Sequence, residues 1–132
     1  MKYKTEVEVR YQETDAMGVV HHSVYPIWFE LARIRGLREE GFAYDVMESK
    51  GMQIPVIGIE VNYLKPLKFG DFIDILFDLE RESASRFRFV YEIQREGVKI
   101  ATGITRHVFM NPNGRPMRPP QEFVDHFFQK KV

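Results

Sequence analysis

The residues best suited to chemistry lie in one short segment, YQETDAMGVVHHSVY, at positions 11–25. It places the carboxylate of Asp15 and the imidazole of His22 in a polar loop that leads directly into a predicted helix. The first turn of a helix has free backbone N–H groups and a positive dipole end, so it can stabilise a developing oxyanion. An aspartate beside it is expected to stay ionised, as a general base or a nucleophile must. Since Gly18 also permits a backbone turn or close ligand approach, the segment predicts acyl chemistry.

Two elements must position this loop, a strand before it and a helix after it. Residues 3–11 alternate apolar and polar side chains, which predicts a half-buried strand. Residues 25–40 show helical spacing, with Gly41 as the predicted end of the helix. The rest is predicted to be a short helix over 42–50, strands over 57–63, 73–79, 87–93 and 98–110, and a terminal helix over 120–130.

The spacing within the long helix predicts which side faces the core. Ile27, Leu31 and Ile34 recur at i, i+4 and i+7 and should be buried, whereas Glu30 and Arg33 should lie on the polar side as an ion pair. Strands joined by short connections pair antiparallel, and such a sheet can cover the helix by curling around it. We therefore expect an α+β fold in a single domain over residues 1–132.

Composition narrows the class of protein. The chain has 132 residues, 19 Lys+Arg against 19 Asp+Glu and no cysteine, so we expect no nucleic-acid partner, disulfide or thiol nucleophile. No apolar run approaches the roughly 18 residues of a membrane span, and the chain start does not resemble a signal peptide. We expect a cytoplasmic protein. The aromatic content of 14% favours a homo-oligomer with aromatic subunit contacts.

The segment from 11 to 33 resembles the signature of the hotdog-fold acyl-CoA thioesterases, in the 4-hydroxybenzoyl-CoA thioesterase and YbgC-like group. The resemblance implies an antiparallel sheet wrapped around one long helix, in dimers that assemble further into tetramers. The active site would lie at the dimer interface. The matching residues are Tyr11, Glu13-x-Asp15, Gly18-Val19-Val20, His21-His22, Tyr25 and Phe29-Glu30-Leu31-Ala32-Arg33.

The resemblance also implies roles for individual residues in hydrolysing an acyl-CoA to the free acid and CoA. Asp15 would be the catalytic general base or nucleophile, and the backbone N–H of His22 would polarise the thioester carbonyl, with its imidazole as a second catalytic group. No metal or cofactor is implied, because CoA is part of the substrate. The expected substrate-binding residues are Gly18, Val19, Tyr25, Ile57, Gly58, Ser83, Ser85 and Arg86.

Departures from the signature keep other functions open. Val24 replaces an asparagine of the family, and Met17 stands where small residues are common, so a non-catalytic module that binds acyl groups or carrier proteins is one alternative. A hotdog hydratase or dehydratase is another, although its signature is missing. Glu13, usually aspartate in the family, is expected to support the loop. Without the resemblance, Asp15 would be read as an ordinary turn residue.

Overall fold

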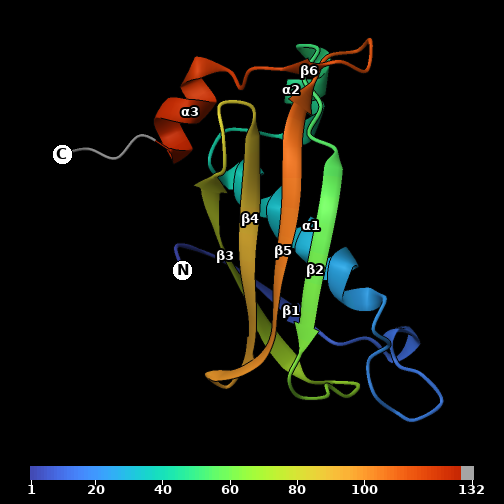
Figure 1. The fold of residues 1–132 in the computed structure, drawn as a ribbon. Helices are drawn as coiled ribbons and strands as arrows, with labels where there is room; N and C mark the ends of the chain where they lie inside the picture. Colours follow the sequence, from blue (N-terminus) through green and yellow to red (C-terminus); the bar gives the residue numbers. More distant parts are fainter. Residues whose placement is uncertain (129–132) are drawn as a thin grey trace.

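The computed structural model describes residues 1–128 as one antiparallel sheet curled around a central helix, α1 (Figure 1). This arrangement confirms the α+β class and the hotdog architecture that the resemblance implied. In chain order the elements are β1 (Tyr3–Glu8), the 3-10 helix η1 (Tyr11–Glu13), α1 (Val24–Glu39), α2 (Tyr44–Ser49), β2 (Val56–Tyr63), β3 (Phe72–Arg81), β4 (Arg86–Arg95), β5 (Val98–Met110), β6 (Pro116–Met117) and α3 (Gln121–Phe127).

The order of strands in the sheet is β1-β3-β4-β5-β2, with β6 added to the end of β5. All strand pairings are antiparallel, as predicted, and β2 pairs with β5 rather than with β3, the next strand in the sequence. The connection after β2 crosses the loop that precedes α1. Leu67 of this connection is fully buried, and its carbonyl accepts a hydrogen bond from the backbone N–H of Val20 at 2.8 Å. This crossing leaves β2 at an edge of the sheet.

The core lies between α1 and the inner face of the sheet, and its position on α1 differs from the prediction. Ile27 is 60% exposed, whereas Arg33 is only 4% exposed and makes no ion pair with Glu30 among the described residues. The buried side of α1 is therefore rotated relative to the prediction, and an aromatic ring packs closely against its backbone. Gly36 lies against the ring of Phe77, so that a Cβ atom there would overlap the ring. On β4, the aromatic side chains of Phe87, Phe89 and Tyr91 are fully buried and form part of this core.

Most predicted elements begin and end within two residues of the observed bounds, and the first strand and the last helix differ by more. The first strand ends at Glu8, and Tyr11 is 74% exposed, because residues 11–13 turn into a 3-10 helix. The carboxylate of Glu13 accepts a hydrogen bond from the backbone N–H of Arg10 at 2.7 Å and fixes this turn. At the other end of the chain, α3 ends at Phe127, and the predicted continuation over 129–130 lies outside the described residues.

Candidate active site

Asp15 lies in a tight loop that holds its carboxylate by one oxygen. Oδ1 accepts hydrogen bonds from the backbone N–H groups of Met17 at 2.9 Å and Val19 at 3.4 Å. The backbone N–H of Asp15 donates in turn to the carbonyl of Val19 at 2.8 Å. Gly18 adopts a φ of +79°, which favours glycine and lets the loop close. Within residues 1–128, Oδ2 accepts no hydrogen bond, so this oxygen is available to a ligand or a water molecule.

Glu13 supports the loop from the core side, as the sequence predicted. The residue is only 6% exposed, and Oε2 accepts a hydrogen bond from the indole Nε1 of Trp28 at 3.1 Å. Arg10 donates to the same carboxylate from its backbone and its guanidinium. The carbonyl of Glu13 accepts a hydrogen bond from the backbone N–H of His21 at 2.9 Å. Hydrogen bonds between charged groups and a buried carboxylate are strong. Glu13 therefore fixes the loop at its start, near Arg10, and at its end, near His21.

His22 lies immediately before the first turn of α1. Its carbonyl accepts a hydrogen bond from the hydroxyl of Tyr63 at 2.8 Å. The backbone N–H groups of Ser23 and Val24 both donate to His21, to its Nδ1 and its carbonyl respectively. The N–H of His22 has no acceptor in the part of the chain that the structure describes, and its exposed imidazole lies 4.1 Å from that of His21. The His22 amide is therefore a donor left free for an oxyanion.

These groups open into one cavity of about 360 Å³. Tyr25 forms its buried wall, with ring centroids 4.9 Å from Tyr63 and 5.2 Å from Trp28. Burial and, to a lesser extent, Tyr63 raise the pKa of Tyr25 to about 12, so its hydroxyl stays protonated at neutral pH. The full lining is Asp15, Val20, His22, Tyr25, Tyr63, Leu64, Lys65 and Pro66.

The structure brings together only part of the predicted site. Asp15, His22 and Tyr25 share the cavity, and Gly18 and Val19 form the loop that holds Asp15. The remaining residues lie at the opposite end of the sheet, where β2 begins and β3 turns into β4 (Figure 1). They are Ile57, Gly58, Ser83, Ser85 and Arg86.

Sequence reasoning missed the contribution of the segment after β2. Tyr63, Leu64 and Lys65 line the cavity, and the hydroxyl of Tyr63 fixes the carbonyl next to the free amide. The alternation over 57–63 placed Tyr63 on one face of a strand but gave no sign of its neighbours. The lysines, proline and glycine of residues 65–71 predict only a turn. Its place beside α1 follows from the crossing connection, which sequence spacing does not reveal.

Two further observations concern metals and membranes. Among residues 1–128, no group of three or more His, Asp and Glu side chains is arranged to hold a metal ion. No helix in that range is long and apolar enough to cross a bilayer.

The chain is similar in sequence to a thioesterase family, to an esterase and to an acyl-CoA thioesterase. Residues 9–128 match the model of the Thioesterase-like superfamily. A putative esterase from Aquifex aeolicus is 35% identical over 117 residues, which cover 89% of this chain and 91% of that protein. A putative acyl-CoA thioesterase from Bacillus subtilis is 47% identical over 68 residues, which cover 52% of this chain and 49% of the relative.

A solved structure extends the similarity to the whole fold. The crystal structure of a DHNA-CoA thioesterase from Staphylococcus aureus is 35% identical and superposes with a TM-score of 0.83. The match covers 96% of this chain and 83% of that one.

Proposed function

The chain belongs to the Thioesterase-like superfamily and is a thioester hydrolase with the hotdog fold, and we propose that it hydrolyses an acyl-CoA to the free acid and CoA at the Asp15 cavity. The observation that carries this proposal is the pairing of a free carboxylate oxygen on Asp15 with the free backbone N–H of His22 at one cavity. The names of the relatives from Bacillus subtilis and Staphylococcus aureus support an acyl-CoA as the substrate.

The two groups have complementary roles in thioester cleavage. The thioester carbonyl oxygen accepts a hydrogen bond from the N–H of His22, which stabilises the negative charge that develops as the carbonyl is attacked. With Asp15 as general base, Oδ2 takes a proton from the attacking water, the C–S bond breaks, and CoA leaves as the thiolate. With Asp15 as nucleophile, Oδ2 itself attacks the carbonyl, and water then hydrolyses the resulting mixed anhydride.

A second copy of the chain completes the site in this proposal. β2 pairs with β5 on one side only, and its open edge carries the exposed apolar side chains of Val56, Ile57 and Ile59. An unpaired edge of this kind is a template for another strand, and two identical strands pair antiparallel about a two-fold axis. With the axis near the middle of β2, Val56 of one protomer lies opposite Tyr63 of the partner subunit. The start of β2 thereby reaches the partner's Asp15 cavity.

This geometry accounts for the predicted substrate-binding residues at the far end of the sheet. Ile57 and Gly58 lie at the start of β2, and the turn with Ser83, Ser85 and Arg86 lies at the same end of the sheet. In the proposed dimer they approach the cavity of the other protomer. A further assembly of dimers into a tetramer and a cytoplasmic location remain predictions from the sequence.

The test is the release of free thiol from short-chain, long-chain and aromatic acyl-CoAs by the wild type and by Asp15→Asn. Loss of the carboxylate should lower kcat by about 10²–10⁴-fold, the usual contribution of a general base. Glu30→Gln is the matched control, because it neutralises an exposed carboxylate on α1 that does not line the cavity. Hydrolysis that Asp15→Asn leaves intact would overturn the assignment of Asp15. A folded wild type that binds acyl-CoA without cleaving any would favour the binding module.

The two roles of Asp15 differ in where solvent oxygen goes. In a single turnover in ¹⁸O-labelled water, label in the Asp15 carboxylate would identify the covalent route. Label confined to the product acid, under demonstrated turnover, would exclude a covalent route in which water attacks the Asp15 carbonyl carbon of the anhydride. Mass spectrometry of the peptide that contains Asp15 measures the difference.

A further inference from the structure

The hydroxyl of Tyr25 is a polar group that the fold leaves without a hydrogen-bond partner. Tyr25 is only 3% exposed, and its hydroxyl makes no hydrogen bond within residues 1–128. Every fully enclosed side-chain nitrogen or oxygen in that range does have a partner. The hydroxyl must therefore reach open space, and the open space beside Tyr25 is the cavity that contains Asp15 and His22.

Two neighbouring rings hold the ring of Tyr25 in one orientation. The ring of Tyr63 lies 4.9 Å away at an angle of 90°, and that of Trp28 lies 5.2 Å away at 64°. Both neighbours are fixed in turn, because Trp28 donates to Glu13 at 3.1 Å and the hydroxyl of Tyr63 donates to the carbonyl of His22 at 2.8 Å. The direction of the Tyr25 hydroxyl is thus set before any substrate binds.

The helix brings this hydroxyl to the side of the free backbone amide. Tyr25 is the second residue of α1 and follows His22 by three positions. Side chains of an α-helix lean toward its N-terminus, so each one covers the turn that precedes its own Cα atom. Tyr63 contacts both residues, through the ring of Tyr25 and the carbonyl of His22. The start of α1 therefore offers two donors to one cavity, one from the backbone and one from a side chain.

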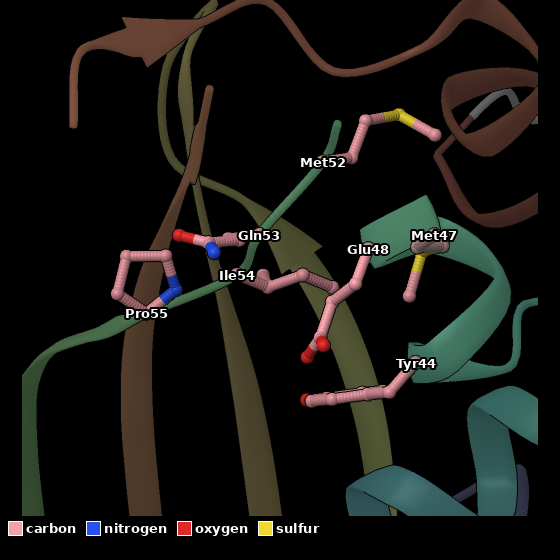
Figure 2. Close-up of a pocket in the computed structure, with 7 residues that line it drawn as sticks. All are labelled: Tyr44, Met47, Glu48, Met52, Gln53, Ile54 and Pro55. Carbon is pink, nitrogen blue, oxygen red and sulfur yellow. The ribbon is translucent and has the colours of Figure 1, made fainter. Parts of the chain in front are cut away.

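Other buried tyrosines of the fold are already paired. A second cavity, of about 230 Å³, lies at the other end of β2 and is lined by Tyr44 (Figure 2). The hydroxyl oxygen of Tyr44 accepts a hydrogen bond from Nε of Arg33 at 3.4 Å. The fully buried Tyr91 accepts one from Nη1 of the same arginine at 3.1 Å. Because Tyr25 has no such partner in the described part of the chain, its partner is expected to come from a ligand.

The unpaired hydroxyl also lowers the stability of the free protein. A hydroxyl that is buried without a hydrogen bond loses its contacts with water and gains none in return. A phenylalanine at position 25 would keep the contacts with Tyr63 and Trp28 and avoid this cost. Groups that are kept at the expense of stability are typical of functional sites.

The pKa of Tyr25 distinguishes a hydrogen-bond donor from a general acid. Burial, and then Tyr63, raise this pKa to about 12, whereas a thiol has a pKa near 8.5. Transfer of the tyrosine proton to a leaving thiolate is therefore unfavourable by a factor of about 10³. A neutral hydroxyl can instead donate a hydrogen bond to a negatively charged oxygen and keep its proton. In a thioester under attack, that oxygen is the one of the carbonyl group.

We propose that the hydroxyl of Tyr25 is a second oxyanion donor, which bonds the thioester carbonyl oxygen together with the backbone N–H of His22. This inference rests on the proposed function and adds a catalytic residue to it. When water or Oδ2 of Asp15 bonds to the carbonyl carbon, the π electron pair of C=O moves onto the oxygen, where both donors stabilise it. An attacking water gives its proton to Asp15. When the C=O bond forms again, the C–S bond breaks, CoA leaves as the thiolate, and Tyr25 still holds its proton.

The kinetic test is Tyr25→Phe, which removes the hydroxyl and keeps the ring. With butyryl-CoA, palmitoyl-CoA and benzoyl-CoA as substrates, kcat should fall about 10²-fold and KM should change by less than about twofold. The urea midpoint should equal or exceed that of the wild type, because the hydroxyl bonds no group of the described chain. Tyr3→Phe is the matched control, since Tyr3 is a half-buried tyrosine that packs on Phe77 and does not line the cavity. It should leave kcat unchanged.

A vibrational measurement tests the contact itself. Hydrolysis is slow in Asp15→Asn, so the acyl-CoA that the wild type cleaves fastest can be bound to it with ¹³C at the carbonyl carbon. A hydrogen bond to the carbonyl oxygen weakens the C=O bond and lowers its stretching frequency. In infrared difference spectra the frequency should rise when Tyr25→Phe is added to Asp15→Asn, and Tyr3→Phe should not change it. A residue that only supports the cavity wall would not shift this frequency.

The outcomes separate this inference from the proposed function. A wild type that cleaves none of the three acyl-CoAs overturns both. An active wild type whose kcat is retained in Tyr25→Phe overturns the inference alone. A change confined to KM, or a carbonyl frequency that Tyr25→Phe leaves in place, also overturns it, because the hydroxyl would then bond another part of the substrate or none.

Discussion

The two ends of β2 carry polar sites that are built in different ways. At the end with Asp15, the reactive groups come from one continuous segment, and backbone hydrogen bonds hold them in place. At the other end, side chains from α1, α2, β4 and β5 meet in the core. Arg33 donates to the hydroxyls of Tyr44 and Tyr91, and a chain of hydrogen bonds continues from Tyr91 through Thr105 and His107 to the carbonyl of Ile54. The first kind of site is encoded locally and the second by the fold.

The largest effect is expected from a substitution that prevents the proposed dimer from forming. Ile59→Lys places a charge at the open edge of β2, where Ile59 is 46% exposed, and should prevent a second strand from pairing. The variant should be a folded monomer whose thiol release is at least 10²-fold below that of the wild type. Analytical ultracentrifugation and the thiol assay measure both properties.

The control is Val98→Lys, since Val98 is 44% exposed at the start of β5, away from this edge. It should keep the assembly state and activity of the wild type. A monomeric Ile59→Lys with full activity would show that one protomer contains the whole site.

The next effect is expected at Glu13, which supports the loop that carries Asp15. Glu13→Ala leaves the indole N–H of Trp28 and the backbone N–H of Arg10 without their acceptor. An unsatisfied buried group costs about 1–3 kcal/mol, so the free energy of unfolding should fall by about 3 kcal/mol in urea titrations. Thiol release should fall as well, because the Asp15 loop loses its anchor. Glu8→Ala, which removes an exposed carboxylate of β1, should change neither.

A smaller loss is expected where glycine lets aromatic rings enter the core. A Cβ atom at Gly103 would overlap the ring of Phe29 and approach the carbonyl of Glu60 to 3.1 Å, so Gly103→Ala should cost about 2 kcal/mol. At Gly36 a Cβ atom would overlap the ring of Phe77, but alanine gains about 1 kcal/mol of helix propensity there. Gly36→Ala should therefore cost less than Gly103→Ala. Equal stability of both variants and the wild type would show that the rings move aside freely.

Much of the fold and the Asp15 end of the site could be predicted because the determining contacts are local. Alternation identified the strands, and helical spacing placed α1 over 25–40, against Val24–Glu39 in the structure. The loop around Asp15, with its glycine turn and the supporting Glu13, follows from residues within a few positions of one another.

The rest depended on contacts between distant residues. The helical spacing predicts Arg33 on the polar side of α1, yet hydrogen bonds to tyrosine hydroxyls on α2 and β4 make its burial possible. The pairing of β2 with β5 likewise depends on the crossing connection that is anchored by Leu67. Neither leaves a periodic signal in the sequence.

The smallest expected effect is a pH dependence of the free energy of unfolding, and it comes from His107 in the buried hydrogen-bond chain. In the unfolded chain His107 has the ordinary pKa of 6.5, and in the folded protein burial and Arg33 lower its pKa to about 3. Between these values the unfolded chain binds a proton that the folded protein does not. The stability from a neutral His107 is therefore complete above pH 6.5 and falls below it, by up to about 1.4 kcal/mol per pH unit.

Urea unfolding between pH 7 and pH 5 should show this fall, and His107→Gln should make it shallower. His126→Gln is the control, because His126 is an exposed residue that pairs with Glu40 on the surface. NMR titration of the wild type provides a check that does not depend on a variant: the His107 ring should remain neutral at pH 5, while the unfolded chain titrates near pH 6.5. A His107 ring that titrates near pH 6.5 in the folded protein would contradict the chain of hydrogen bonds from Arg33 to Ile54. In that case the core would tolerate a second positive charge beside Arg33.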